Sequence, residues 1–151
     1  MTVEERGAVK IARVFDFPRE SVFRMWTDPK KVSRWFGSPE GCVTVVSEWD
    51  PRPGGAIKTE DITNHVSLTG AFTRVVAPEL LVFRGVAKGP GPYFPNETLN
   101  TVTLEELGPK RTRITVAVNV VMAPRGVVEA LKEGFRGGWG QSLEKLQRAF
   151  R

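Results

Sequence analysis

The chain has 151 residues, of which 40% are hydrophobic and 26% are charged. These fractions are ordinary for a folded protein and exclude a disordered or fibrous chain. The formal net charge is +5, but the basic residues are scattered in short groups, so we expect a solvated surface and no nucleic-acid partner.

The hydrophobic segments predict a cytoplasmic protein without a membrane span. No apolar run approaches the roughly 20 residues that cross a bilayer, and the first residues, MTVEERGAVK, lack the apolar core of a secretory signal. A single cysteine, Cys42, excludes an internal disulfide, and we expect it to be a small apolar residue in a strand. The length fits one domain over residues 1–151.

The N-terminal part of the chain predicts one strand and two short helices. Residues 8–16, AVKIARVFD, alternate as a strand does, and the following proline predicts a helix over 18–26. Asp28 before Pro29 is a second start signal, for a helix that reaches Phe36. Helices this short are unstable alone, so their apolar faces must pack on a larger element.

The middle of the chain, residues 41–121, predicts six strands. The runs are rich in Val, Thr, Ile and Phe and are separated by turn residues, so neighbouring strands should be antiparallel. The segment 88–95, KGPGPYFP, is the one long loop, and we expect it over the mouth of a groove.

The C-terminal residues 125–151 predict a long helix with one apolar face. That face comprises Val128, Leu131, Phe135, Trp139, Leu143, Leu146 and Phe150. A twisted antiparallel sheet of seven strands can wrap around such a helix, which predicts an α+β fold in which the first strand pairs with the last. The short helices, with Trp26, Trp35 and Phe36, would close one end of the sheet.

Four glycines interrupt the predicted long helix, at positions 134, 137, 138 and 140. Each costs roughly 1 kcal/mol relative to alanine in a helix interior. Either the backbones of helix and sheet approach closely or kink there, or the missing side chains leave a cavity beside Phe135 and Trp139.

Recognisable catalytic and metal-binding patterns are absent from the sequence. His65 is the only histidine, which excludes a His-based triad and a multi-histidine metal site. Glu60 and Asp61 are adjacent in a predicted strand, so they should point to opposite faces, and we interpret both as surface charges. Arg13 is an inward-facing charge that either pairs with an acidic group or binds a ligand anion. We therefore predict no catalytic residue, no metal and no cofactor.

The stretch RVFDFPRESVFRMWTDPKKVSRWFG resembles the opening of the family related to the C-terminal domain of the activator of the heat-shock-protein-90 ATPase, a START-like branch of the SRPBCC superfamily. DPRPGG, GAFTRVVAPELLVF and TVTLEELGPKRTRITV resemble later parts of that family, in the right order, as does the Gly-Trp of the last helix. The resemblance implies a helix-grip fold. Members of the superfamily carry lipids and other hydrophobic molecules, cyclise polyketides or assist a chaperone.

Our leading hypothesis is a non-enzymatic domain that binds a small hydrophobic ligand between the long helix and the sheet. Two alternatives are contact with a chaperone and a cyclase-type enzyme, for which Arg13, Glu60, His65 and Tyr93 are the acid–base candidates. The resemblance also allows a homodimer. The candidate ligand-binding residues are Trp35, Phe36, Trp49, Phe72, Phe135, Trp139, Leu143 and Arg13.

Overall fold

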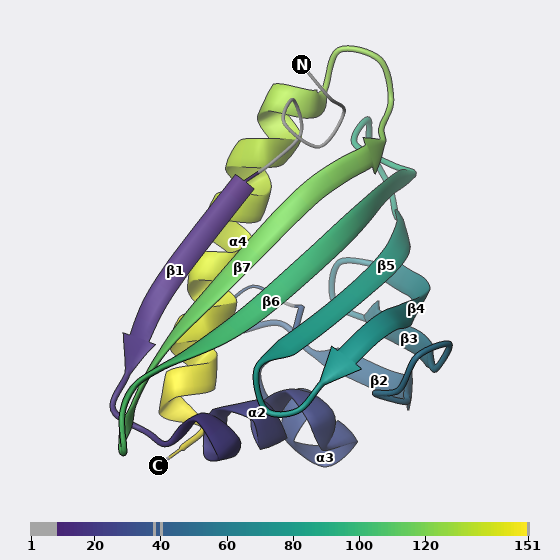
Figure 1. The fold of residues 1–151 in the computed structure, drawn as a ribbon. Coiled ribbons are helices and arrows are strands. Elements are labelled where there is room, and N and C mark those ends of the chain that lie inside the picture. The colour runs from purple at the N-terminus through teal and green to yellow at the C-terminus, as the bar shows by residue number, and fades with distance from the viewer. Residues whose placement is uncertain (1–8, 38, 40, 151) are drawn as a thin grey trace.

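The computed structural model describes residues 9–37, 39 and 41–150, and it contains a curved sheet with a long helix along one side (Figure 1). The strands are β1 (Val9–Phe15), β2 (Thr44–Trp49), β3 (Ala56–Asp61), β4 (Val66–Val76), β5 (Leu80–Lys88), β6 (Asn96–Gly108) and β7 (Arg111–Met122). The helices are α2 (Arg19–Thr27), α3 (Pro29–Val32) and α4 (Val128–Arg148).

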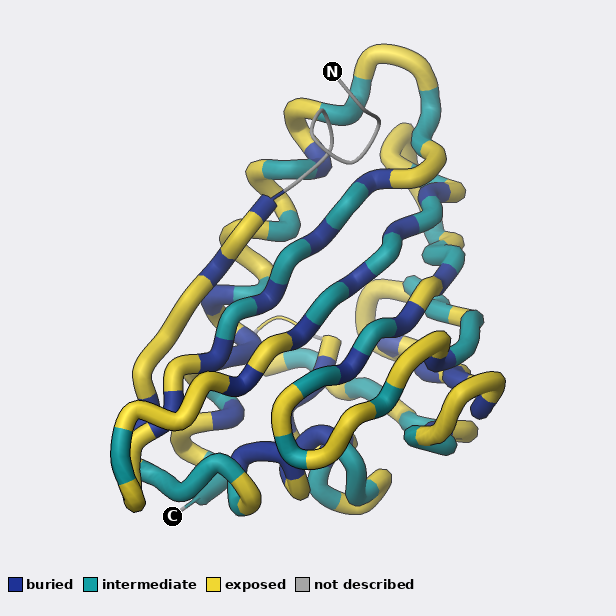
Figure 2. The backbone as a smooth tube through the Cα atoms, viewed as in Figure 1, coloured by how far each residue is buried: buried dark blue, intermediate teal, exposed yellow. Residues whose placement is uncertain are grey.

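The strands form one seven-stranded antiparallel sheet in the order β1-β7-β6-β5-β4-β3-β2. β1 completes the sheet by pairing with β7, so that Val9 lies opposite Val118 and Phe15 opposite Thr112. Buried positions alternate with less buried ones along β6 and β7, because only one face of each strand packs against the core (Figure 2). The predicted α+β helix-grip arrangement is confirmed, including the pairing of the first and last strands.

The two short helices are positioned by proline and by an aspartate cap. Pro18 directly precedes α2, which begins at Arg19, one residue later than predicted. Asp28 caps α3 by accepting a 3.0 Å hydrogen bond from the Lys30 backbone N–H. α3 ends at Val32, four residues before the predicted end. The next backbone donors, Arg34 and Trp35, bond to carbonyls three residues earlier, a tighter winding than an α-helix.

Two indole N–H groups cap the C-terminal end of α2. The Met25 carbonyl has no helical donor, because the residue four positions later is Pro29, and it accepts a 2.9 Å hydrogen bond from Trp35 Nε1. The Trp26 carbonyl accepts a 2.7 Å bond from Trp49 Nε1. These orphan carbonyls of the helix end therefore fix two large aromatic side chains in the core.

The long helix begins at Val128, three residues after its predicted start. Gly126 has a φ of +82°, a left-handed conformation that a right-handed helix cannot include. The predicted end at residue 151 lies outside the described residues. α4 packs mainly against β1 and β7, which are neighbours at one edge of the sheet, so it leaves space above the strands farther along.

Candidate functional site

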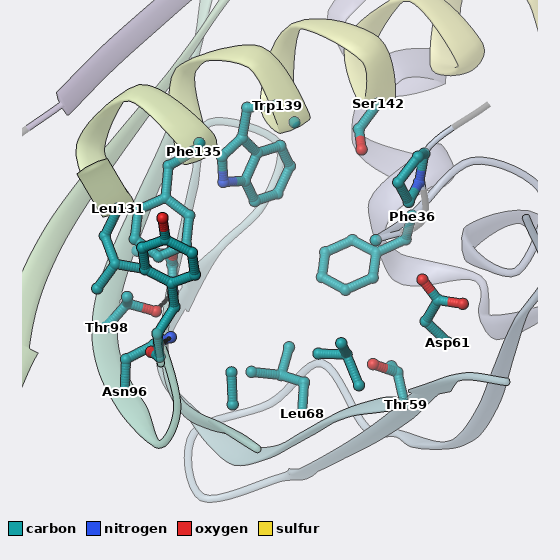
Figure 3. Close-up of a pocket in the computed structure, with 18 of the residues that line it drawn as sticks. Phe36, Thr59, Asp61, Leu68, Asn96, Thr98, Leu131, Phe135, Trp139 and Ser142 are labelled. Carbon is teal, nitrogen blue, oxygen red and sulfur yellow. Dashed lines mark hydrogen bonds between the residues drawn. The ribbon is translucent and has the colours of Figure 1, made fainter. Parts of the chain in front are cut away.

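A cavity of about 520 Å³ lies between α4 and the concave face of the sheet (Figure 3). This volume is within the range of sites for drug-sized ligands. Residues from β2 to β6, from α4 and from two loops line it: Phe36, Gly37, Pro39, Thr44, Thr59, Asp61, Val66, Leu68, Phe83, Ala87, Tyr93, Phe94, Asn96, Thr98, Asn100, Ala130, Leu131, Gly134, Phe135, Gly138, Trp139 and Ser142.

One stripe of α4 forms the roof of the cavity. Each member lies three or four residues from another, so together they share a helix face: Leu131, Gly134, Phe135, Gly138, Trp139 and Ser142. A Cβ added at position 134 or 138 would meet no atom within 4 Å apart from the helix's own backbone. These two glycines therefore border open volume, which confirms the cavity interpretation over close approach of the sheet.

Aromatic rings make up the apolar part of the wall. Phe36 meets Trp139 edge to face with ring centroids 5.7 Å apart, and it lies 6.4 Å from Phe83. Tyr93 and Phe94, from the loop predicted at the groove mouth, add to the lining. Rings fixed by such contacts offer a preformed apolar surface to a guest.

The β6 side of the cavity carries a row of buried polar side chains. Asn96, Thr98 and Asn100 are 2%, 6% and 4% exposed, and they share one face because they are two residues apart along the strand. Asn100 Nδ2 donates to Thr98 Oγ1 at 3.0 Å, and Asn96 Nδ2 donates to the Tyr93 carbonyl at 3.1 Å. These three residues were not among the predicted site residues, although the sequence indicates that they face inward, because Val102 and Leu104 continue the same strand face as core residues.

A carboxylate lies on the other side of the cavity. Asp61 is 7% exposed and, with Thr59, faces the cavity opposite Asn96 and Thr98 (Figure 3). Our interpretation of Asp61 as a surface charge is therefore wrong. Glu60 is exposed, which confirms that the two acids point to opposite faces of β3.

The end of β3 holds the Asp61 carboxylate in place. Oδ1 accepts hydrogen bonds from the backbone N–H groups of Thr63 and Asn64, at 3.0 and 2.9 Å, and Oδ2 accepts one from Asn64 Nδ2 at 2.8 Å. Hydrogen bonds from several N–H donors stabilise negative charge on a carboxylate. The turn after β3 thus fixes an anionic group at the cavity wall.

The aromatic and aliphatic residues predicted to bind a ligand fall into two groups. Phe36, Phe135 and Trp139 line the cavity. The others with aromatic or aliphatic side chains lie in the core beside it and are not among its lining residues: Trp35, Trp49, Phe72 and Leu143. Contact of any of these residues with a ligand stays a prediction.

Arg13 lies on the inner face of β1 but is exposed, contrary to the expectation of a desolvated charge. Its Nη1 donates to the Ala12 carbonyl at 2.9 Å, and its Nη2 lies 3.3 Å from the place that a Cβ of residue 140 would take. The small Gly140 therefore makes room for the guanidinium where β1 meets α4. Arg13 is separate from the described cavity lining.

The structure also shows the surroundings of His65, Tyr93 and Cys42. His65 is exposed in a turn with a φ of +59°. Tyr93 lines the cavity and is 41% exposed. Cys42 precedes β2 instead of lying in a strand, which corrects our expectation, and its Sγ accepts a 3.3 Å hydrogen bond from Asn64 Nδ2.

The described part of the chain contains neither a cluster suited to a metal ion nor a helix suited to a membrane. Among these residues, no three of His, Cys, Asp and Glu lie together in a way that could hold a metal ion. No described helix combines the length and the apolar character that crossing a bilayer requires.

Comparisons with known proteins place the fold in a family. The family model described as activator of Hsp90 ATPase homolog 1-like protein matches residues 16–151. Protein CV1439 from Chromobacterium violaceum is 26% identical, with a TM-score of 0.76 over 95% of this chain and 96% of its own. A comparison with curated proteins found no match.

Two more distant solved structures share the fold. A protein from Arthrobacter aurescens is 23% identical, with a TM-score of 0.80 over 99% of this chain and 88% of its own. Protein Ms6760 from Mycobacterium smegmatis is 17% identical, with a TM-score of 0.80 over 98% of this chain and 93% of its own. Together with the family model, which covers most of the sequence, they agree with the resemblance found in the motifs. The chain belongs to the family of activator of Hsp90 ATPase homolog 1-like proteins.

Proposed function

We propose that the protein binds a small, mainly apolar molecule in the cavity beneath α4. The observation that carries this proposal is the open volume next to Gly134 and Gly138, where a helix interior dispenses with side chains despite the cost. Each glycine lowers helix stability by roughly 1 kcal/mol relative to alanine. A binding site is a physical reason for keeping that volume empty.

The composition of the lining supports an apolar guest with a few polar groups. Phe36, Phe83, Phe135 and Trp139 present rings, whereas most of the polar side chains lie on the two sides of the cavity, with Ser142 on α4. Burial of apolar ligand surface contributes about 25 cal/mol per Å², and a small number of polar groups sets the orientation of the guest.

The lining favours binding over catalysis. The charged member of the described lining is Asp61, whose carboxylate already accepts three N–H hydrogen bonds at the end of β3. Of the four acid–base candidates, Arg13, Glu60 and His65 are exposed and separate from the described cavity lining. Tyr93 lines the cavity but is 41% exposed. A held carboxylate is better suited to orienting a guest than to exchanging protons with it.

The proposal is tested by ligand discovery combined with a matched pair of cavity variants. Native mass spectrometry of the purified protein and a screen of neutral apolar compounds would identify a guest. Gly134→Leu places an aliphatic group in the cavity and should weaken binding of that guest by about tenfold or more. Gly137→Leu is the control, because position 137 is exposed and separate from the described cavity lining.

Two results would contradict the proposal. One is a screen in which no apolar compound binds to the folded protein. The other is equal loss of affinity in the Gly134→Leu and Gly137→Leu variants, because that would indicate a general effect on α4 and not obstruction of the cavity.

A further inference from the structure

The charge of the cavity lining is opposite to that of the chain as a whole. Asp61 is the only charged residue in the described lining, which contains no lysine, arginine or histidine. The whole chain carries a formal net charge of +5. An anionic ligand would therefore be attracted to the protein at long range but would find no cationic side chain in the described cavity wall.

The negative charge at the cavity wall is fixed in position. Thr63 and Asn64, in the turn that follows β3, donate three N–H hydrogen bonds to the Asp61 carboxylate. The side chain is 7% exposed, so water screens its field less than it would at the surface. The carboxylate thus acts on any charged group that enters the cavity.

The remaining polar lining can bind a neutral head group. Hydroxyls are carried by Thr44, Thr59, Tyr93, Thr98 and Ser142, and amides by Asn96 and Asn100. Hydroxyls and amides both donate and accept hydrogen bonds, so they suit an alcohol, a ketone or an amide. A carboxylate that enters the same space loses its hydration without gaining a cationic partner.

We propose that the cavity selects neutral or cationic amphiphiles and discriminates against carboxylates such as fatty acids. This inference rests on the proposed function and specifies the chemical class of its ligand. An ammonium head group gains from the Asp61 carboxylate, a hydroxyl head group uses the polar side chains, and a carboxylate head group is repelled by Asp61.

The test uses three probes that share one alkyl chain and differ only in the head group: decanol, decylamine and decanoic acid. Each would displace the neutral dye Nile red from the unmodified protein at neutral pH, below the micelle-forming concentration of the probe. We expect decanoic acid to bind on the order of tenfold more weakly than decanol, and decylamine at least as tightly as decanol. Repetition at high salt removes the long-range effect of the net charge.

The outcomes separate this inference from the proposed function. Decanoic acid that binds as tightly as decanol would overturn the inference alone, because the cavity would still be an apolar binding site. If none of the three probes displaces the dye, the inference falls together with the proposed function. The ranking is measured on the unmodified protein and does not depend on the folding of any variant.

Two substitutions should move the ranking in a predictable direction. Asp61→Asn keeps an oxygen acceptor for the turn and removes the charge, so decylamine should lose about tenfold in affinity relative to decanol. Thr98→Lys adds a cation on the opposite side and should strengthen decanoic acid binding while weakening decylamine binding. An unchanged ranking in both folded variants would refute a role for charge in the cavity.

Discussion

The indole of Trp139 stacks on the indole of Trp26, with ring centroids 5.7 Å apart and planes 20° from parallel. Trp26 is completely buried, whereas Trp139 lines the cavity. One pair of rings therefore connects the core at the end closed by α2 to the wall of the cavity. Packing at that end of the sheet consequently holds the cavity wall in place.

The three core tryptophans should differ in their response to the same substitution. Trp26 Nε1 is buried without a hydrogen-bond partner among the described residues, whereas Trp35 Nε1 and Trp49 Nε1 cap carbonyls at the end of α2. Replacement by phenylalanine removes similar volume at each site. We expect Trp35→Phe and Trp49→Phe to be about 1–2 kcal/mol less stable than Trp26→Phe, because each leaves a buried carbonyl unsatisfied.

Urea unfolding followed by far-ultraviolet circular dichroism measures these differences without relying on the tryptophan signal. Trp26→Phe is the matched control, since it loses the same ring area and no hydrogen bond. Equal losses of stability in all three variants would show that the indole caps contribute nothing to α2.

Glycine substitutions should have opposite effects in α4 and in the sheet. Gly137 has no atom within 4 Å of an added Cβ, outside the helix's own backbone, so Gly137→Ala should raise the free energy of unfolding by up to about 1 kcal/mol. A Cβ at Gly70 would lie 1.9 Å from the Arg84 carbonyl oxygen on the neighbouring strand. We expect Gly70→Ala to lower stability by roughly 2 kcal/mol or more.

Thermal unfolding of both variants beside the unmodified protein checks this pair. A destabilised Gly137→Ala variant would mean that α4 requires glycine for its backbone conformation. A well-tolerated Gly70→Ala variant would mean that β4 and β5 separate easily at this point.

The sequence pattern was sufficient for the fold because periodicity reports which side of an element is buried. The apolar residues of α4 recur on one helix face, and β1 alternates, so the pairing of the first and last strands followed from the need to bury both. The errors at helix ends have local causes. The left-handed conformation of Gly126 makes α4 begin later than predicted, and the backbone after Val32 winds more tightly than an α-helix.

Residues of the cavity were harder to predict than residues of the fold. Trp35 and Phe36 are equally apolar neighbours, yet only Phe36 belongs to the described cavity lining. The difference depends on the curvature of the sheet and on the position of α4 over β1 and β7, neither of which a local pattern specifies. Likewise, the alternating polar residues of β6 match the pattern of a solvent-facing strand surface, although they face an internal space.

Arg13 provides a test of the boundary of the cavity. It is exposed, and its guanidinium contacts β1 and α4 outside the described lining. We expect Arg13→Gln to leave the affinity for a neutral apolar ligand within about twofold of the original value, as for other surface substitutions. Dye displacement by decanol measures this, with Gly134→Leu as the variant that obstructs the cavity. A loss near tenfold in Arg13→Gln would place Arg13 in the binding site after all.

Replacement of the buried polar residues on β6 should weaken ligand binding more than it lowers the stability of the fold. Asn100 Nδ2 donates to Thr98 Oγ1 at 3.0 Å and to the Phe83 carbonyl at 3.4 Å. The double substitution Thr98→Val with Asn100→Leu therefore removes both partners of one buried hydrogen bond and the donor of a second, longer one. Replacement of both partners by apolar groups is close to neutral or stabilising. We therefore expect the free energy of unfolding to change by no more than about 1 kcal/mol in either direction, with decanol bound severalfold more weakly.

Decane provides the contrast in ligand chemistry, because it lacks a group that could bond to these side chains, and its affinity should be unchanged or higher in the double variant. Thr101→Val, whose side chain is on the other face of β6, is the control and should alter neither affinity. If the double variant binds decanol and decane with equal losses, the residues act through the shape of the cavity. If it unfolds, the hydrogen bonds of Asn100 are a structural requirement of β6, and the polar row is explained without a ligand.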